Sequence, residues 1–310
     1  MKDTILLYAK GLAMGAADVV PGVSGGTIAF ITGIYDRLLA AIAAVPQAVM
    51  HLARGRIGQA WKAADATFLI TLLAGVLTSI FSLARIITYL LEEHPIPVWS
   101  FFFGLILVSV YLVGREVEQR RLSRLVCFAA GLLFAYWITV MAPMQMGSGP
   151  LSIFMAGAIA ICAMILPGIS GSFILVLLGL YPVVLGAVRS LDFGLLGFFA
   201  AGALLGLVSF ARLLSWMLKH YRDGTLAFLT GLMVGSLNKV WPWKETLTWR
   251  TNSAGEEVPV LQQNLLPGAY GELTGQDPQM FIALLLAVSG VALVLGLEWV
   301  AGRVRQPVAS

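Results

Sequence analysis

The sequence predicts an all-α polytopic membrane protein with two inverted-topology repeats, each a re-entrant helical hairpin followed by three transmembrane helices. Three observations lead to this prediction. Of the 310 residues, 59% are hydrophobic and 12% are charged, which is unlike a soluble globular chain. Several apolar runs are long enough to cross a bilayer as helices. One short motif occurs in both halves of the chain, so we place the repeats at residues 1–145 and 146–310.

The duplicated motif is Pro-Gly-x-Ser-Gly, which begins at Pro21 and again at Pro167. Aligning 21–42 with 167–188 gives nine identities in 22 positions without a gap, which indicates an internal duplication. Helix interiors avoid proline and clustered glycine, because proline removes an N–H group and glycine leaves the backbone loose. We therefore expect a break in each half. The expected hinge residues are Pro21, Gly22, Pro167 and Gly168.

Each break joins two short apolar arms into a hairpin, at 4–43 in the first repeat and at 152–189 in the second. We favour re-entrant hairpins over full spans, because the first arm is short and carries Lys10 and Asp18. The longer apolar runs supply three membrane-spanning helices per repeat. The expected spans are 67–91, 98–114 and 124–141, then 194–218, 225–241 and 280–301.

The duplication continues into the spans at an offset of 127 residues. This offset matches Gly75 with Gly202, Gly104 with Gly231, Arg85 with Arg212 and Ser109 with Ser236. The difference in spacer length falls in the 46–66 loop of the first repeat. That loop is basic and mildly amphipathic, so it either lies on the membrane surface or is a plain solvated loop.

Loop charge predicts that both termini are cytoplasmic, because basic residues gather in alternate loops. The basic segments are 37–66, 115–124, 219–224 and 303–310, and the neutral or acidic segments are 92–97, 142–151 and 242–279. Each half crosses the membrane an odd number of times, whether three or five, so the second half enters upside down relative to the first. The net charge of +4 reflects this loop bias, and we expect no nucleic-acid partner.

The residues that follow each break are suited to an anion. Unpaired backbone groups cost several kcal/mol each in hydrocarbon, so a broken helix persists only where protein or a polar cavity covers it. Free amides at a helix start favour negative charge, and hydroxyl groups add donors. The alternative is that the glycines only allow close helix packing. The expected cradle consists of Ser24, Gly25, Gly26 and Thr27 in the first half and Ser170, Gly171, Ser172 and Phe173 in the second.

Three charged residues inside apolar segments are further candidates. Arg85 and Arg212 occupy equivalent repeat positions, and a guanidinium suits phosphate, although each side chain can instead snorkel to an interface. Asp18 corresponds to Met164 in the second half, so the repeat is asymmetric here. An acid in apolar surroundings is a candidate for proton or sodium coupling. The alternative for Asp18 is a helix cap or a salt bridge.

The sequence contains no nucleophile–base pair, metal-ligand cluster or nucleotide-binding loop. We therefore expect a protein that is not an enzyme, with no catalytic residues, no metal and no cofactor. Trp241 and Trp243, together with Lys239 and Lys244, are typical of an outer-interface belt. The two lysines are also placed to meet an anionic headgroup.

Three stretches resemble those of a known family. They are GAADVVPGVSGGT at 15–27, LPGISGS at 166–172 and KVWPW at 239–243. In this combination they resemble the bacterial undecaprenyl-phosphate translocase family, formerly a family of unknown function, and the resemblance covers essentially the whole chain. It implies return of the C55 lipid carrier from the outer to the inner leaflet of the bacterial inner membrane, for reuse in cell-wall synthesis.

The resemblance also implies a site and partners. The phosphate headgroup would be held by the 24–27 and 170–173 turns together with Arg85 and Arg212. The implied partners are undecaprenyl phosphate, membrane lipid and, for coupling, H⁺ or Na⁺. The residues alone leave open an ion-coupled transporter of a small soluble anion, a lipid-phosphate-processing enzyme and a non-catalytic assembly factor.

Overall fold

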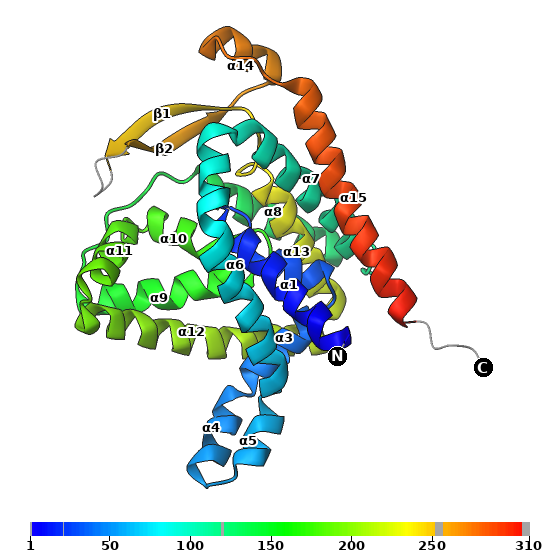
Figure 1. The fold of residues 1–310 in the computed structure, drawn as a ribbon, viewed down its shortest axis with the longest axis vertical. Helices are drawn as coiled ribbons and strands as arrows, with labels where there is room; N and C mark the ends of the chain where they lie inside the picture. The colour runs from blue at the N-terminus through cyan, green and yellow to red at the C-terminus, as the bar shows by residue number, and fades with distance from the viewer. Residues whose placement is uncertain (1, 21, 119–120, 252–256, 306–310) are drawn as a thin grey trace.

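Helices make up most of the molecule, and a small β-hairpin lies at one end (Figure 1). The computed structural model describes residues 2–20, 22–118, 121–251 and 257–305. Pro21, one of the four expected hinges, lies outside the described residues. The elements of the first half are α1 (Lys2–Val19), α2 (Gly25–Ile31), α3 (Tyr35–Ala43), α4 (Val45–Ala53), α5 (Ile57–Ala63), α6 (Ala66–Glu93), α7 (Pro95–Gly114) and α8 (Leu122–Val140).

The second half has no counterparts of α4 and α5, and it adds a β-hairpin and α14 before its last helix. Its elements are α9 (Pro150–Ile165), α10 (Gly171–Leu177), α11 (Tyr181–Ser190), α12 (Phe193–His220), α13 (Arg222–Ser236), β1 (Lys244–Thr251), β2 (Glu257–Asn264), α14 (Pro267–Thr274) and α15 (Met280–Arg305). The strands are antiparallel. Within the described residues, α6, α7, α8, α12 and the 280–299 part of α15 are long and apolar enough to cross a membrane, which confirms a polytopic membrane protein.

The fifth expected span, 225–241, extends too far at its C-terminal end. Helix α13 stops at Ser236 and the chain turns. The side chain of Asn238 donates to Thr139 Oγ1 at 2.8 Å, and Asn264 at the end of β2 donates to Asn238 Oδ1 at 2.8 Å. These polar contacts hold the 237–240 turn against α8 and the β-hairpin, and Pro242 follows.

The second arm of each hairpin, for which the sequence suggests a single helical piece at 26–43 and at 172–189, is sharply bent. Helix α2 meets the helical segment that follows it at 118°, and α10 meets α11 at 110°. A glycine with positive φ stands at each bend, Gly33 at 69° and Gly179 at 72°. Because both glycines lie within apolar sequence, hydropathy alone does not predict an interruption of the helix at either one.

Close pairing of helices holds the bundle together. Helix α1 runs along α6, α9 along α12, α8 along α13 and α15 along α7. The matched glycines Gly75 and Gly202 each press against the first arm of their own hairpin, at the carbonyls of Tyr8 and Phe154, and neither leaves space for a Cβ atom. Small residues at such contacts allow helix backbones to approach closely in membranes.

Ion pairs join several loops at the end of the molecule that carries both termini (Figure 1). Arg222 at the start of α13 pairs with Asp36 of α3 at 3.2 Å and with Glu116 after α7 at 3.3 Å. Arg115 pairs with Glu298 of α15. The predicted basic segments 115–124 and 219–224 therefore meet, beside Asp36 at the edge of a third.

Two loops contain structure that the sequence reading missed. The 46–66 loop forms the helices α4 and α5, which project together from the body (Figure 1). At the opposite end, the 242–279 segment forms β1, β2 and α14, so a purely α-helical description is incomplete. The expected aromatic belt is also wrong for Trp243, which is buried and donates through Nε1 to the carbonyl of Pro278 at 2.8 Å.

Candidate functional site

The two Pro-Gly breaks meet in the middle of the molecule. The hydroxyl of Ser24, in the first break, donates to the carbonyl of Met164 at 3.0 Å. The backbone amide of Gly168, in the second break, donates to Thr27 Oγ1 at 3.1 Å. Both hydroxyl-bearing side chains are fully buried. The duplicated motifs are therefore joined by direct hydrogen bonds between residues about 140 positions apart.

A third hydroxyl from the first half reaches the same place. Tyr35, at the start of α3, donates to the carbonyl of Ile165 at 3.1 Å. Met164 and Ile165 end α9, where the last carbonyls of a helix lack intrahelical partners. First-half hydroxyls therefore satisfy second-half carbonyls that the break leaves open.

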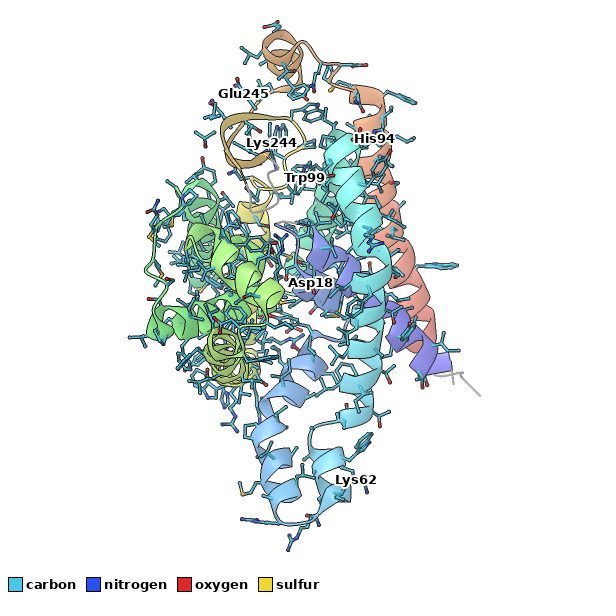
Figure 2. The ribbon with its side chains drawn as sticks, turned by 60° about the vertical axis from the view of Figure 1, so that its left-hand side comes forward. Asp18, Lys62, His94, Trp99, Lys244 and Glu245 are labelled. Atoms are coloured by element: carbon cyan, nitrogen blue, oxygen red, sulfur yellow. The ribbon has the colours of Figure 1, made fainter. Side chains whose placement is uncertain are left out.

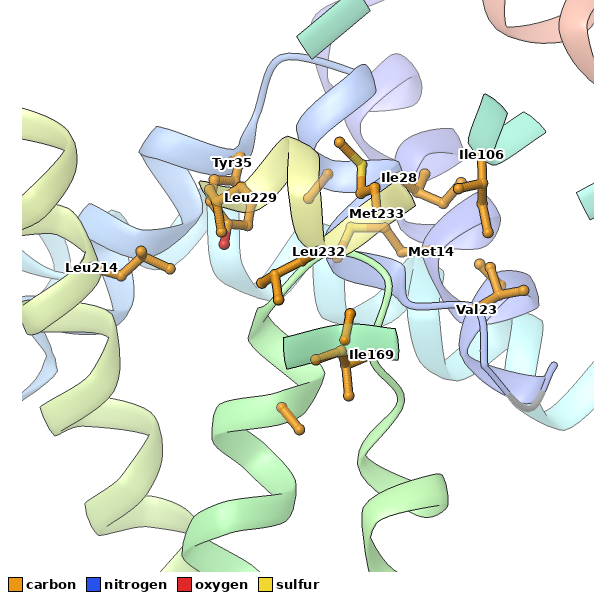
Figure 3. Close-up of a cluster of buried hydrophobic side chains, with 14 of the residues drawn as sticks. Met14, Val23, Ile28, Tyr35, Ile106, Ile169, Leu214, Leu229, Leu232 and Met233 are labelled. Carbon is orange, nitrogen blue, oxygen red and sulfur yellow. The ribbon is translucent and has the colours of Figure 1, made fainter. Parts of the chain in front are cut away.

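Apolar side chains of the motifs fix the breaks in the core. Val23 and Ile169 are equivalent motif residues, and both are buried in the cluster that contains Leu232 and Met233 of α13 (Figure 3). Gly22 and Gly168 carry matching positive φ angles of 86° and 90°. These are values that glycine adopts readily and that other residues rarely do, so the motif's second position needs glycine in both copies.

A small cavity of about 10 Å³ lies between the two breaks. That volume holds one water molecule at most, so the breaks are closed on each other. The last part of α8, the end of α13 and both hinge glycines form its walls. The lining residues are Gly22, Ala135, Ile138, Thr139, Gly168, Ile169, Phe173, Ser236 and Lys239.

Lys239 is the cationic residue in this lining. Its Nζ lies 4.7 Å from the ring centroid of Phe173, in a cation–π contact. Its Cγ approaches Gly22 so closely that a Cβ atom there would lie 2.8 Å away. Among the described residues, no carboxylate forms an ion pair with Lys239.

Lys244, the first residue of β1, places a second cation beside this one. Its Nζ donates to the carbonyl of Lys239 at 2.5 Å and lies 4.0 Å from the ring centroid of Trp99. Burial, followed by the charge of Lys239, lowers the pKa of Lys244 well below its ordinary value. Figure 2 shows Lys244 and Trp99 toward the end opposite Lys62, with Asp18 between the two ends. Lys239 and Lys244 therefore place two amino groups next to the breaks, and neither forms an ion pair among the described residues.

The first expected cradle does not offer free amides. The amide of Gly25 donates to Asp18 Oδ1 at 2.6 Å, and the amide of Gly26 donates to Ser24 Oγ at 3.0 Å. The amide of Thr27 donates to the carbonyl of Ser24 at 2.9 Å. Asp18 and Ser24 therefore cap α2, which is the structural alternative stated for Asp18.

In the second cradle, at 170–173, fewer backbone amides donate to an acceptor than in the first. Ser170 and Ser172 share a hydrogen bond at 2.9 Å between their hydroxyls. Within the part of the chain that the structure describes, the amides of Gly171, Ser172 and Phe173 have no acceptor. Met164 replaces the capping carboxylate here, which explains the difference from the first half.

The matched arginines lie away from the breaks. Arg85 is exposed on α6, and Arg212 is exposed on α12. Arg212 Nε donates to the carbonyl of Ala43 at 3.1 Å, which ties α12 to the end of α3. Neither arginine lines the central cavity, and a role for them in binding a headgroup stays a prediction.

The comparisons with known proteins agree with the duplicated motif. The VCA0040-like, undecaprenyl phosphate translocase-like family model matches residues 14–258. That match spans both breaks and the Lys239 segment. The chain belongs to this family.

Two curated relatives carry the same name. A polyprenyl-phosphate transporter of Vibrio cholerae serotype O1 is 57% identical over 293 residues, which cover 94% of this chain and 95% of the relative. A polyprenyl-phosphate transporter of Staphylococcus aureus is 35% identical over 262 residues, which cover 75% of this chain and 84% of the relative. No solved structure matches the chain.

The predicted site did not include the three polar side chains of this lining, namely Thr139, Ser236 and Lys239. The sequence placed Lys239 at the outer interface, where it could meet an anionic headgroup, and not at a break; the equivalent repeat position, Leu112, is not a lysine. A usable signal was present: two lysines, at 239 and 244, flank a Trp-Pro-Trp turn at the end of an apolar helix. Ser236 was matched to Ser109 in the repeat alignment, but nothing in the sequence placed it at a break.

Proposed function

We propose that this protein returns undecaprenyl phosphate from the outer to the inner leaflet of the bacterial inner membrane, where cell-wall synthesis reuses the carrier. The observation that carries this proposal is the meeting of both Pro-Gly breaks beside Lys239, whose charge no described carboxylate neutralises. The relatives named polyprenyl-phosphate transporters supply the class of cargo.

A phosphate monoester headgroup needs cations and hydrogen-bond donors to cross hydrocarbon, while its polyprenyl tail can remain in lipid. Lys239 supplies an amino group beside the hinge glycines, and the amino group of Lys244 lies next to the carbonyl of Lys239. The amides of Gly171 to Phe173 add further donors where the second half has no capping carboxylate. Charge-assisted hydrogen bonds of this kind are about twice as strong as neutral ones.

The movement follows alternating access between two inverted halves, 1–145 and 146–310, with re-entrant hairpins and both termini cytoplasmic. The cavity of about 10 Å³ is too small for a phosphate group, so the described conformation is closed. Opening requires the Thr27–Gly168 and Ser24–Met164 hydrogen bonds to part. Repeat-matched helices that pack in matched ways, such as α1 on α6 and α9 on α12, support this inverted architecture.

Asp18 links the break to a coupling ion, H⁺ or Na⁺, in this proposal. Its carboxylate already accepts the Gly25 amide at the start of α2. Protonation or sodium binding at Asp18 would weaken that cap and so loosen the first break. Because Met164 stands at the equivalent position, coupling resides in the first half.

The test is transfer in sealed proteoliposomes that contain radiolabelled undecaprenyl phosphate. An externally added phosphatase cleaves only the outer-leaflet lipid, so complete cleavage requires movement between leaflets. We expect protein-dependent loss of the protected fraction, with a rate that changes when a proton or sodium gradient is applied. No protein-dependent transfer under any gradient would overturn the proposal.

Two parallel measurements separate the other function classes. Uptake of inorganic phosphate into the same vesicles would indicate a transporter of small anions. Release of inorganic phosphate without added phosphatase would indicate an enzyme. We expect neither activity.

A further inference from the structure

A second and larger cavity opens between α7, α8 and α13, at the end of the molecule that carries the termini. Its volume is about 420 Å³, within the usual range for sites that bind small molecules. Apolar side chains form most of the wall, and two arginines stand at the start of α8. The lining residues are Gly114, Val117, Arg121, Leu122, Arg124, Leu125, Phe128, Ala227 and Thr230.

The arginines of this cavity differ from their neighbours in having no acidic partner. Arg222 and Arg115 are engaged in ion pairs close by. Within the described residues, no hydrogen bond or ion pair involves the guanidinium of Arg121 or Arg124, and the Nε atom of Arg124 is buried without an acceptor. A buried donor that lacks a partner costs about 1–3 kcal/mol, so binding of an acceptor such as an anion beside Arg124 would be favourable.

The start of α8 adds to the positive potential. Helix α8 begins at Leu122 and is 19 residues long, with no side-chain cap at its N-terminus. The first turn, from Leu122 to Leu125, lies in the cavity wall. The amides of Leu122 and Ser123, which have no acceptor among the described residues, and the helix dipole favour negative charge in the same place as the two guanidinium groups.

The large cavity and the central cavity share one seam, between α8 and α13. Phe128 lines the large cavity and Ala135 lines the central one, which is a separation of about 10 Å along the helix. Between them, Gly131 of α8 and Gly231 of α13 press against the facing backbone with no space for a Cβ atom. The two cavities are thus separated by a short stretch of closely packed helix backbone.

We propose that the large cavity binds the phosphate end of an isoprenoid-phosphate lipid on the cytoplasmic side, as the station where the headgroup leaves the central site. Arg121 and Arg124 bind the phosphate, and the apolar wall of Leu122, Leu125 and Phe128 contacts the first isoprene units. This inference rests on the proposed function and adds a second lipid-phosphate site to it.

A cysteine reporter tests the site directly in the full-length protein. Leu122 is 77% exposed and lines the cavity, so we replace it with cysteine in a Cys127→Ala, Cys162→Ala background. The measurement is the rate at which N-ethylmaleimide alkylates the cysteine at position 122. It is made separately in the presence of farnesyl phosphate, farnesol and inorganic phosphate. A matched reporter, Leu151→Cys, stands at a position that is 75% exposed on α9.

We expect farnesyl phosphate to slow alkylation at position 122 about ten-fold when its concentration is about ten times its dissociation constant, since protection follows occupancy. Farnesol and inorganic phosphate give little protection, and position 151 is unaffected. Protection is lost in the double variant Arg121→Gln/Arg124→Gln. It is retained in the double variant Arg121→Lys/Arg124→Lys and in the single variant Lys239→Gln. Equal protection by farnesol, equal protection by inorganic phosphate, or no protection by farnesyl phosphate overturns the inference.

The farnesol comparison needs no arginine variant, so it decides the question even if the double glutamine variant fails to fold. The leaflet-transfer assay separates this inference from the proposed function. Transfer without protection at position 122 overturns the second site alone. Protection without any transfer overturns the proposed function and leaves the site standing.

Discussion

The backbone amide of Gly168 donates a hydrogen bond to the hydroxyl of Thr27 at 3.1 Å, so one break holds the other closed. Thr27 is fully buried, and loss of its hydroxyl would leave the glycine amide without an acceptor. The contact joins the two halves at the point where we propose that they separate during transfer.

Replacement of Thr27 by valine keeps the shape and removes the acceptor. We expect the free energy of unfolding to fall by about 1–3 kcal/mol, the cost of an unsatisfied buried donor. The measurement is thermal or denaturant unfolding of the purified protein in detergent. Thr225→Val is the matched control, because the buried Thr225 hydroxyl bonds only to the Tyr221 carbonyl one turn earlier. Equal losses in the two variants would contradict a special role for the contact between breaks.

Two substitutions separate the capping and coupling roles of Asp18. Asparagine keeps an oxygen that accepts the Gly25 amide, whereas alanine removes it. We expect Asp18→Ala to cost about 0.5–2 kcal/mol, as for other lost caps, and Asp18→Asn to cost less. Transfer by Asp18→Asn should no longer respond to a proton or sodium gradient. A full gradient response in the asparagine variant would assign coupling elsewhere.

Burial of the Lys244 ammonium predicts a pH dependence of stability. The pKa of Lys244 is lower in the folded state than in the unfolded state. At pH values between these two pKa values the unfolded chain binds more protons than the folded chain, so the free energy of unfolding rises with pH. Lys244→Met removes this dependence, so it should melt at a higher temperature than the wild type near neutral pH. The difference in melting temperature between Lys244→Met and the wild type should become smaller as the pH rises toward the ordinary pKa of lysine.

The control for this measurement is Lys62→Met, on the exposed helix α5. It should leave both the melting temperature and its pH dependence unchanged. A Lys244→Met variant that melts below the wild type at neutral pH would mean that the contact with Trp99 outweighs the cost of burial.

Glycine substitutions test the seam between the two cavities. Gly231→Ala introduces a Cβ atom against the Phe128 carbonyl, and overpacking of this kind costs about 1–3 kcal/mol. Gly197→Ala, on α12, meets open space and should be neutral or slightly stabilising because alanine favours helix. Comparison of the two melting temperatures checks this expectation. An unchanged melting temperature in Gly231→Ala would mean that α8 and α13 can separate at this contact with little loss of stability.

The long spans were predictable because about 20 apolar residues in a row have few other stable arrangements. Helices α6, α7, α8 and α12 differ from the expected ranges by at most three residues at either end. The breaks were predictable as well, since both proline–glycine pairs interrupt apolar helices. The bends at Gly33 and Gly179 were missed because a single glycine in apolar sequence also fits a continuous helix.

The site was only partly predictable, and the reason is tertiary. The expected cradle amides of α2 are occupied by Asp18 and Ser24, which depends on how the chain folds back after the break. Lys239 reaches the cavity only because α13 stops at Ser236 and the β-hairpin holds the following turn. Neither the end of α13 at Ser236 nor the packing of the β-hairpin on the next turn is indicated by a hydrophobic periodicity in the sequence.

Lys239 offers the most direct test of the central claim, which is that a phosphate headgroup passes between the two breaks. The measurement is the initial rate of undecaprenyl-phosphate transfer in proteoliposomes with equal amounts of wild type, Lys239→Gln, Lys239→Arg and Lys219→Gln, the last at an exposed lysine on α12. Loss of a charge-assisted hydrogen bond, at about 1.5–3 kcal/mol, predicts a rate about 10–100-fold lower for Lys239→Gln. We expect partial activity in Lys239→Arg and full activity in Lys219→Gln. A folded Lys239→Gln protein that transfers the lipid at the wild-type rate would contradict the account.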